Sequence, residues 1–219
     1  VVENAAGEFI AFIDADQYVD RDWLRELVKV MIGDDRIAAV EGVTRSAPTR
    51  SLVAKLEGYT WTLYNERRLR EEGASSVTSG GVLFRKRAVI EVGGYDPNFR
   101  VAGEDPDLSF RLVKAGWLLK FSPKAVVYHR WREDLRSLLR EYFNWGRGAA
   151  IFAKKHKSRV SPWRFFPLIA FFSGVVHAIK AYRRFHGVSC FLIPLHYAIK
   201  RAAWFAGYLA EVLRCPPGG

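Results

Sequence analysis

Two aspartates, Asp14 and Asp16, stand one residue apart directly after the apolar run of residues 9–13. A short apolar run bounded by polar residues predicts a buried strand. Ligands of open α/β sheets bind beyond the carboxyl ends of the strands, and carboxylate oxygens suit Mg²⁺ or Mn²⁺ when substrate phosphates complete the coordination. The pair therefore predicts a metal-assisted reaction on a phosphorylated substrate. Because Asp-x-Asp alone is a common pattern, a turn in which an aspartate caps the next element stays open as an alternative.

A second group of carboxylates, Glu104, Asp105 and Asp107, surrounds Pro106 ahead of a helical pattern that ends before Gly116. Negative charge at a helix N-terminus is stabilised by the free amides and the dipole, so N-capping by Asp105 explains the group without any function. A carboxylate in this place is also a candidate general base. Burial and acidic neighbours would raise its pKa, whereas capping amides would lower it, and the sequence does not decide between them.

A third candidate is His129, which ends the apolar run of residues 125–128 much as Asp16 follows residues 9–13. If both strands end at one edge of the sheet, the imidazole and the carboxylate face one crevice. A neutral imidazole beside a carboxylate is a reasonable Mn²⁺ site. A lone histidine is more often a surface or core residue, and that alternative stays open.

The elements expected to position these residues alternate between strands and helices through residues 1–129. Such alternation predicts an α/β sheet. The expected strands are residues 9–13, 37–43, 82–84, 117–121 and 125–128, and the expected helices are residues 23–31, 52–70, 87–92 and 106–115. Ser122-Pro123 is expected to separate the last two strands.

The character of the chain changes after His129. Residues 1–109 hold 14 Lys/Arg and 19 Asp/Glu, whereas residues 110–219 hold 20 and 4, within a net charge of +11 over 219 residues. A basic amphipathic helix is expected over residues 135–155, followed by apolar segments at residues 165–179, 187–199 and 202–210. A basic, aromatic-rich half of this kind predicts an anionic partner, either a membrane surface or nucleic acid. The two cysteines, Cys190 and Cys215, have no metal-binding spacing.

These apolar segments are shorter than the ~20 residues that span a bilayer. We expect membrane association with spanning left open, and a buried helical subdomain is the alternative. The expected interface anchors are Trp163, Arg164, Tyr182, Arg183, Arg184 and Trp204. The expected polybasic stretch is Lys154, Lys155, Lys157 and Arg159, which a solvated helix face would also explain.

Several motifs resemble, in order and spacing, the family 2 glycosyltransferases of the GT-A fold. They are AGEFIAFIDAD at residues 6–16, SGGVLFR at 79–85, GGYD at 93–96, GEDPDLSFRL at 103–112 and GW at 116–117. The resemblance implies a GT-A (Rossmann-like) mixed sheet flanked by helices, followed by C-terminal apolar helices. It also implies a catalytic domain at residues 1–150, lacking the family's N-terminal nucleotide-binding unit, and a membrane-associated region at residues 151–219.

The resemblance also implies roles for individual residues. Asp14 and Asp16 correspond to the pair that binds Mn²⁺ or Mg²⁺ and the diphosphate of a nucleotide-sugar donor, with Asp16 the more direct ligand. His129 corresponds to the C-terminal metal-binding histidine. The remaining correspondences are a general base for the acceptor hydroxyl in the acidic motif (Asp105, with Glu104), a glycine loop near the donor sugar (Gly80, Gly81) and a diphosphate contact (Arg147).

The implied activity is inverting, metal-dependent transfer of a sugar to a lipid-linked or saccharide acceptor at a membrane surface, with the catalytic domain cytoplasmic. No nucleic-acid partner is expected. The chain shows no Gln-x-x-Arg-Trp motif of the processive polysaccharide synthases, which favours single transfers.

Two other functions fit part of the pattern. Haloacid-dehalogenase-type phosphatases also place Asp-x-Asp after an apolar strand, with the first aspartate as a phosphorylated nucleophile. Their pattern resembles Asp-x-Asp-x-Thr/Val, whereas Tyr18 fills the last position here. A non-enzymatic basic module that binds membranes or nucleic acid is the second alternative, without a recognised nucleic-acid motif to support it.

Overall fold

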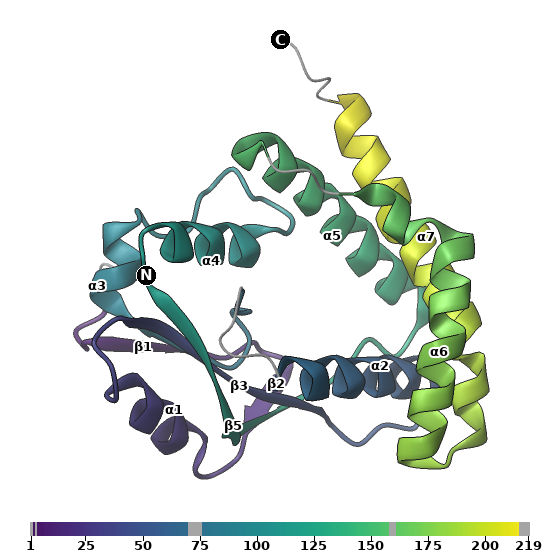
Figure 1. Cartoon of the computed structure of the whole chain (residues 1–219), viewed down its shortest axis with the longest axis horizontal. Coiled ribbons are helices and arrows are strands. Elements are labelled where there is room, and N and C mark those ends of the chain that lie inside the picture. The colour runs from purple at the N-terminus through teal and green to yellow at the C-terminus, as the bar shows by residue number, and fades with distance from the viewer. Residues whose placement is uncertain (1, 3, 70–75, 158–160, 215–219) are drawn as a thin grey trace. The chain divides into compact units, whose positions relative to one another are not determined.

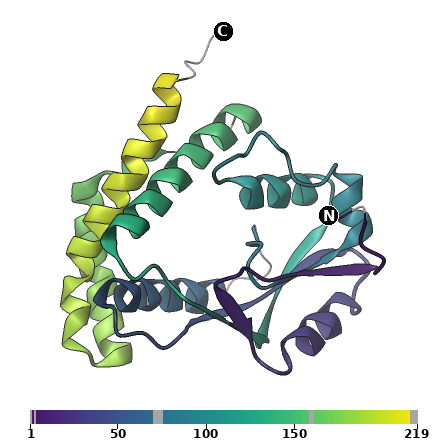
Figure 2. The same ribbon diagram turned by 180° about the vertical axis from the view of Figure 1, so that it is seen from behind.

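The computed structural model of the chain describes residues 2, 4–69, 76–157 and 161–214 (Figures 1 and 2). Internal contacts divide the chain into two compact units. Unit 1 comprises Val1–Pro48, Tyr64–Pro97 and Glu104–Arg130, and unit 2 comprises Thr49–Leu63, Asn98–Gly103 and Trp131–Gly219. The units are interleaved along the sequence, and the functional division expected at residue 150 stays a prediction.

Unit 1 is built on one mixed five-stranded sheet in the order β1-β4-β3-β5-β2. Strands β3 and β5 run parallel, and the other neighbouring pairs are antiparallel. This topology confirms the mixed α/β sheet expected from the sequence. The strands are β1 (Phe9–Phe12), β2 (Gln17–Val19), β3 (Ile37–Ser46), β4 (Val82–Arg85) and β5 (Leu118–His129).

Helices cover both faces of this sheet (Figure 1). Helix α1 (Trp23–Met31) buries Trp23, Leu27 and Met31 against one face. Helices α3 (Lys86–Glu91) and α4 (Glu104–Lys114) pack on the other face, where Leu108 and Leu112 are buried in the core. Each large apolar side chain that is fully buried contributes about 1.5–3 kcal/mol to folding, so the packing of these helices on the sheet is the main stabilising contribution in the unit.

The structure corrects four details of the predicted elements. Strand β1 lies at the edge of the sheet and is only half-buried. Strand β2 was not predicted, because a segment of three residues is too short to show a period of alternating polar and apolar residues. The two strands expected around Ser122-Pro123 are one strand, β5, because the proline sits at an irregularity in the pairing with β3, where a ladder hydrogen bond is not required. Helix α4 begins at Glu104, so Asp105 lies in its first turn and is not its cap.

Unit 2 is helical. It contains α5 (Leu135–His156), α6 (Pro167–Phe185) and α7 (Ile193–Arg214), the short 3₁₀ segments Pro162–Phe165 and Val188–Leu192, and the residues of α2 (Leu52–Arg68) up to Leu63. Helices α5 and α7 come close because Gly146 and Gly207 lack side chains: a Cβ atom at either glycine would overlap the backbone of the facing helix. The aromatic side chains of Tyr142 and Trp204 fill the core beside this crossing.

The basic helix and the apolar segments expected after residue 129 are thus helical, and the last two segments merge into the 3₁₀ turn and α7. No helix among the described residues combines the length and the apolar content that crossing a bilayer requires. Arg159, Cys215 and the last residue of the helix expected over residues 52–70 lie outside the described residues.

Candidate active site

The three predicted metal ligands meet in unit 1 at the place where β1 and β5 end and β2 begins. Asp14 and Asp16 lie in the turn between β1 and β2, and β2 pairs antiparallel with β5 so that Gln17 stands opposite His129. The backbone N–H of Arg130 donates to the carbonyl of Asp16 at 2.9 Å, which fixes the turn against the end of β5. The unpredicted strand β2 is therefore the element that brings Asp16 to His129.

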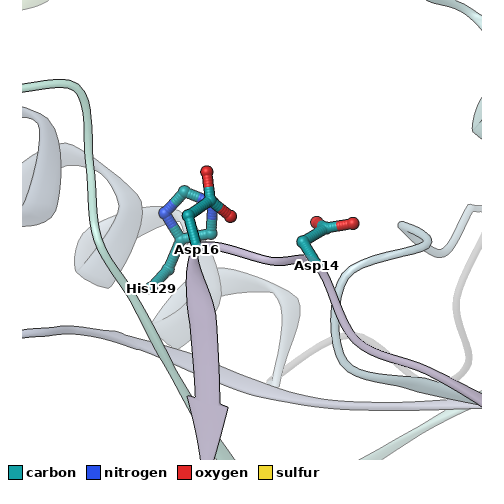
Figure 3. Close-up of side chains that lie close together, drawn as sticks. All are labelled: Asp14, Asp16 and His129. Carbon is teal, nitrogen blue, oxygen red and sulfur yellow. The ribbon is translucent and has the colours of Figure 1, made fainter.

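The side chains of Asp14, Asp16 and His129 form a cluster suited to a divalent cation (Figure 3). One ligand atom from each lies within 4.8 Å of the others, and Nε2 of His129 is 3.4 Å from Oδ1 of Asp16. Opposite ligands of an octahedral ion with bonds of about 2.1 Å are about 4.2 Å apart, so a small inward movement suffices. Asp14 is exposed, which leaves room for oxygens from water or substrate. Two carboxylates and one imidazole fit a divalent metal ion.

The glycine loop that the sequence assigned to the donor site lies against this cluster. A Cβ atom at Gly80 would overlap the Asp14 carboxylate and the Gln17 side-chain amide, so a larger residue here would displace these two side chains. Gly81 has a φ of +85°, a left-handed conformation that favours glycine, and its N–H donates to the carbonyl of Phe12 at 3.0 Å. The loop is thereby tied to the end of β1.

The same loop holds the predicted general base. The backbone N–H and the hydroxyl of Ser79 both donate to Oδ2 of Asp105, at 3.0 and 3.2 Å. Burial raises the pKa of Asp105 to about 7, the Glu104 and Glu41 carboxylates add to this, and the hydrogen bonds from Ser79 oppose it. The structure thus decides the question left open by the sequence: burial outweighs the amides. The adjacent residues Ser79 and Gly80 connect Asp105 directly to Asp14.

One supporting residue, Glu41, was missed by the sequence reasoning. It is 3% exposed in β3, and its carboxylate accepts hydrogen bonds from the Thr78 hydroxyl at 2.7 Å and from Arg68 at 3.0 Å. A buried charge on a central strand is unfavourable unless it is paired, so Glu41 anchors the segment that leads into Ser79 and Gly80. A single glutamate inside the apolar run of residues 37–43 was the available signal.

The last predicted site residue, Arg147, lies on α5 in unit 2, where its Nε is 2.7 Å from Oε2 of Glu211. Its contact with a donor diphosphate stays a prediction. The other predicted residues all belong to unit 1, where Glu104 opens the helix that carries Asp105.

Substitution of Asp16 by alanine is expected to weaken Mn²⁺ binding at least about tenfold, because it removes one of three protein ligands. Isothermal titration with MnCl₂ measures the change. His129→Ala should act in the same direction, and Asp20→Ala, which removes an exposed carboxylate just after β2, is the matched control. Equal Mn²⁺ affinity in Asp16→Ala and the control would contradict the cluster as the metal site.

A mixed sheet covered by helices on both faces, with a carboxylate–histidine cluster at the ends of its strands, defines an α/β protein with a candidate metal site. The family described as "Glycosyl transferase family group 2" matches residues 9–213, so the chain belongs to this family. Membership in it does not favour the phosphatase or the non-enzymatic module.

Curated relatives agree with this family. The chain is 30% identical over 165 residues to the pre-mycofactocin glycosyltransferase of Mycobacterium tuberculosis (strain CDC 1551 / Oshkosh), covering 71% of the chain and 34% of that protein. It is 25% identical over 186 residues to the poly-beta-1,6-N-acetyl-D-glucosamine synthase of Staphylococcus aureus (strain COL), covering 83% of the chain and 45% of that protein. The chain therefore spans less than half the length of these relatives.

Among solved structures, the chain is similar to the mannosyltransferase PcManGT from Pyrobaculum calidifontis in complex with GDP-Man and Mn²⁺. The TM-score is 0.60 at 15% identity, covering 98% of the chain and 65% of that protein. At this identity the similarity concerns the fold alone, and it confirms the GT-A fold expected from the sequence.

Proposed function

We propose that the protein containing this chain transfers a sugar from a nucleotide-diphosphate donor to an acceptor hydroxyl, with inversion and with a divalent metal ion. One observation carries the proposal: Ser79 holds Asp105 while the adjacent Gly80 touches Asp14, so a candidate base stands beside a candidate metal site. Family membership supports the same chemistry.

The roles of the chain's own residues follow from their geometry. Ser79 fixes Oδ2 of Asp105, which leaves Oδ1 to accept the proton of the attacking hydroxyl. A pKa near 7 makes this carboxylate an effective base at neutral pH. Asp14, Asp16 and His129 would hold the metal ion, which when bound neutralises charge on the diphosphate leaving group. Direct attack on the anomeric carbon from the face opposite the diphosphate inverts its configuration without a covalent sugar–enzyme intermediate.

The donor set supports Mn²⁺ over Mg²⁺ as the working ion. Mg²⁺ is bound almost entirely by oxygen ligands and keeps several waters, whereas first-row transition metals, Mn²⁺ included, accept an imidazole ligand more readily. The imidazole of His129 therefore shifts the preference toward Mn²⁺, the ion present in the similar mannosyltransferase structure.

A screen of nucleotide sugars tests the proposed function. The protein is incubated with each donor and MnCl₂, and release of nucleoside diphosphate is followed with and without saccharide or lipid-linked acceptors. We expect at least one donor to be consumed with Mn²⁺ and not with EDTA. Phosphate release with a trapped aspartyl-phosphate on Asp14, and no donor consumed, would contradict the proposal and favour a phosphatase.

We further propose that unit 2 contacts an anionic membrane surface, with the catalytic domain on the cytoplasmic side and single transfers to a lipid-linked or saccharide acceptor. One face of α6 buries the small residues Ala170, Gly174, Ala178 and Ala181. Its other face exposes large apolar side chains, namely Leu168, Ile169, Phe172, Val176 and Ile179, which are 47–70% exposed. Exposed basic residues of the same unit, Lys154, Lys155, Arg183 and Arg184, suit anionic lipid headgroups.

Vesicle sedimentation tests this surface. The protein should sediment with vesicles that contain phosphatidylglycerol and less with pure phosphatidylcholine vesicles. Replacing Phe172 and Val176 together by glutamate should weaken sedimentation at least about tenfold, since it places two charges at the lipid boundary. Leu24→Glu, at an apolar residue on α1 that is 49% exposed, is the control. Equal sedimentation of the double variant and the control would contradict the membrane contact.

A further inference from the structure

Two buried polar atoms beside the candidate active site lack a hydrogen-bond partner among the described residues: Oδ1 of Asp105 and the hydroxyl of Tyr95. Buried polar groups in folded proteins are nearly always paired, and leaving one unpaired is unfavourable. Tyr95 belongs to the GGYD motif, to which the proposed function gives no role. Two such groups at the same site are available to one ligand that hydrogen-bonds with both.

The position of Tyr95 is fixed from two sides. Its ring packs edge-on against Phe12, the last residue of β1 before the Asp14 turn, with ring centroids 6.2 Å apart. Arg111 holds the turn that precedes Tyr95, donating to the carbonyls of Val92 at 2.6 Å and Gly94 at 2.7 Å. The packing and these hydrogen bonds therefore hold Tyr95 in a defined position in the site.

Arg111 is itself fixed. Its Nε donates to the fully buried carboxylate of Asp107 at 2.8 Å, one helical turn before it on α4. The helix that carries Asp105 therefore also holds the turn that carries Tyr95, which couples the positions of the two unpaired groups.

The chemical state of Tyr95 is set by its surroundings. Burial raises its pKa, and the carboxylates of Asp105, Glu104 and Asp14 raise it further, so the hydroxyl stays protonated at neutral pH. The Asp105 carboxylate raises the pKa of Tyr95 both by its charge and by a side-chain hydrogen-bond interaction, so the two groups are close, although neither the Tyr95 hydroxyl nor Oδ1 of Asp105 has a partner in full hydrogen-bond geometry. A protonated phenol beside an unpaired carboxylate oxygen offers one donor and one acceptor to an incoming group.

We propose that the Tyr95 hydroxyl and Oδ1 of Asp105 together bind the acceptor hydroxyl, which makes Tyr95 a further catalytic residue of the proposed transfer. An alcohol donates one hydrogen bond and accepts others, so it complements this pair. The acceptor O–H donates to Oδ1 of Asp105, and the Tyr95 hydroxyl donates to the same acceptor oxygen.

The step balances. The acceptor oxygen forms a bond to the anomeric carbon as its proton passes to Asp105. The bond from that carbon to the diphosphate oxygen breaks, and its electron pair leaves with the diphosphate. Hydrogen bonds of this kind are often long in the free enzyme and shorten when substrate binds.

Tyr95→Phe tests this contact, which rests on the proposed function. We expect transfer to the acceptor to fall at least about tenfold in kcat/KM, with a higher acceptor KM. Binding of Mn²⁺ with nucleoside diphosphate, which involves neither the Tyr95 hydroxyl nor Oδ1 of Asp105, should stay at the wild-type level. Tyr18→Phe, on an exposed tyrosine of β2, is the matched control.

Three outcomes would contradict the proposed contact between Tyr95 and the acceptor. The first is a rate of transfer in Tyr95→Phe equal to that of the wild type. An unchanged acceptor KM with a shifted acid limb of the pH profile assigns Tyr95 to positioning Asp105 instead of binding the acceptor. If the wild-type protein neither transfers nor hydrolyses any nucleotide sugar while binding Mn²⁺, the proposed function itself is wrong, and the acceptor contact is lost with it.

Discussion

Asp105→Asn is expected to reduce sugar transfer by about 10²–10⁴-fold while Mn²⁺ and donor binding remain close to wild type. Asparagine keeps the shape of the side chain and an oxygen that accepts from Ser79, but it takes up no proton. Transfer by the full protein is measured with the donor that its screen identifies, and Asp22→Asn, an exposed carboxylate at the start of α1, is the control. Most of the activity surviving in Asp105→Asn would show that another group is the base.

Asp105→Asn should also lose the part of the pH dependence of folding stability that comes from ionisation of Asp105. The pKa of Asp105 is about 7 in the folded state against a usual 3.8, so the native protein holds a proton that the unfolded chain releases between these values. Folding stability from this group therefore falls as pH rises from about 4 to 7, by about 1.4 kcal/mol per pKa unit. Wild-type activity should rise over the upper part of this range as the base ionises.

Urea unfolding near pH 5 and near pH 8 measures this linkage. The free energy of unfolding should fall between pH 5 and pH 8 in the wild type, and it should fall by less in Asp105→Asn. Equal slopes in the two proteins would mean that Asp105 has an ordinary pKa, and the assignment of a base poised at neutral pH would fail.

Lys200→Met is expected to lower the free energy of unfolding of unit 2 by about 3–5 kcal/mol near pH 8. Lys200 is 2% exposed, and its ammonium donates to Oε2 of Glu57 at 2.8 Å and to the Thr60 hydroxyl at 3.1 Å. His196 Nε2 lies 2.8 Å from the same oxygen, and the Tyr142 hydroxyl donates to Oε1 at 2.6 Å. Removing the lysine leaves a carboxylate buried without its cation.

The loss should be smaller near pH 5.5, because His196 can replace the missing charge. In wild type, burial lowers the pKa of His196, and Lys200 lowers it further. Without Lys200, we expect the Glu57 carboxylate to raise the folded-state pKa of His196 above the unfolded value. The resulting stabilisation is present below the unfolded pKa and is lost as pH rises through the folded one.

Urea unfolding at both pH values measures these effects, with Lys180→Met, an exposed lysine of α6, as the control. If Lys200→Met lowers the free energy of unfolding by less than about 1 kcal/mol near pH 8, or by the same amount at both pH values, Glu57 is not an ionised carboxylate paired with Lys200.

Much of unit 1 follows from local patterns. The alternating strands and helices, the aspartates after β1 and the histidine at the end of β5 are all readable, because apolar runs and polar ends are properties of neighbouring residues. Strand β2 is not readable, since Gln17, Tyr18 and Val19 form a strand only through pairing with β5, more than a hundred residues later. The sequence therefore predicted that Asp16 and His129 lie close together, and the structure shows that the pairing of β2 with β5 brings them there.

The buried charges mark where sequence reasoning stops. Glu57 lies in an expected helix and the sequence gives no sign that it is buried, because three of its hydrogen-bond partners, Tyr142, His196 and Lys200, are 85, 139 and 143 positions away. The partners of Glu41 are 27 and 37 positions away. For Asp105 the sequence named burial and amide donors as opposing effects, but their balance depends on Ser79, which another loop supplies.

Anomalous diffraction at the manganese edge, on crystals of the full protein with Mn²⁺ and a nucleoside diphosphate sugar, tests the central claim most directly. We expect one manganese peak bound by carboxylate oxygens of Asp14 or Asp16 and by the imidazole of His129, with the diphosphate on the same ion. We also expect the Asp105 carboxylate on the side of the sugar opposite the diphosphate. A manganese ion bound elsewhere, or a donor sugar out of reach of Asp105, would contradict this arrangement.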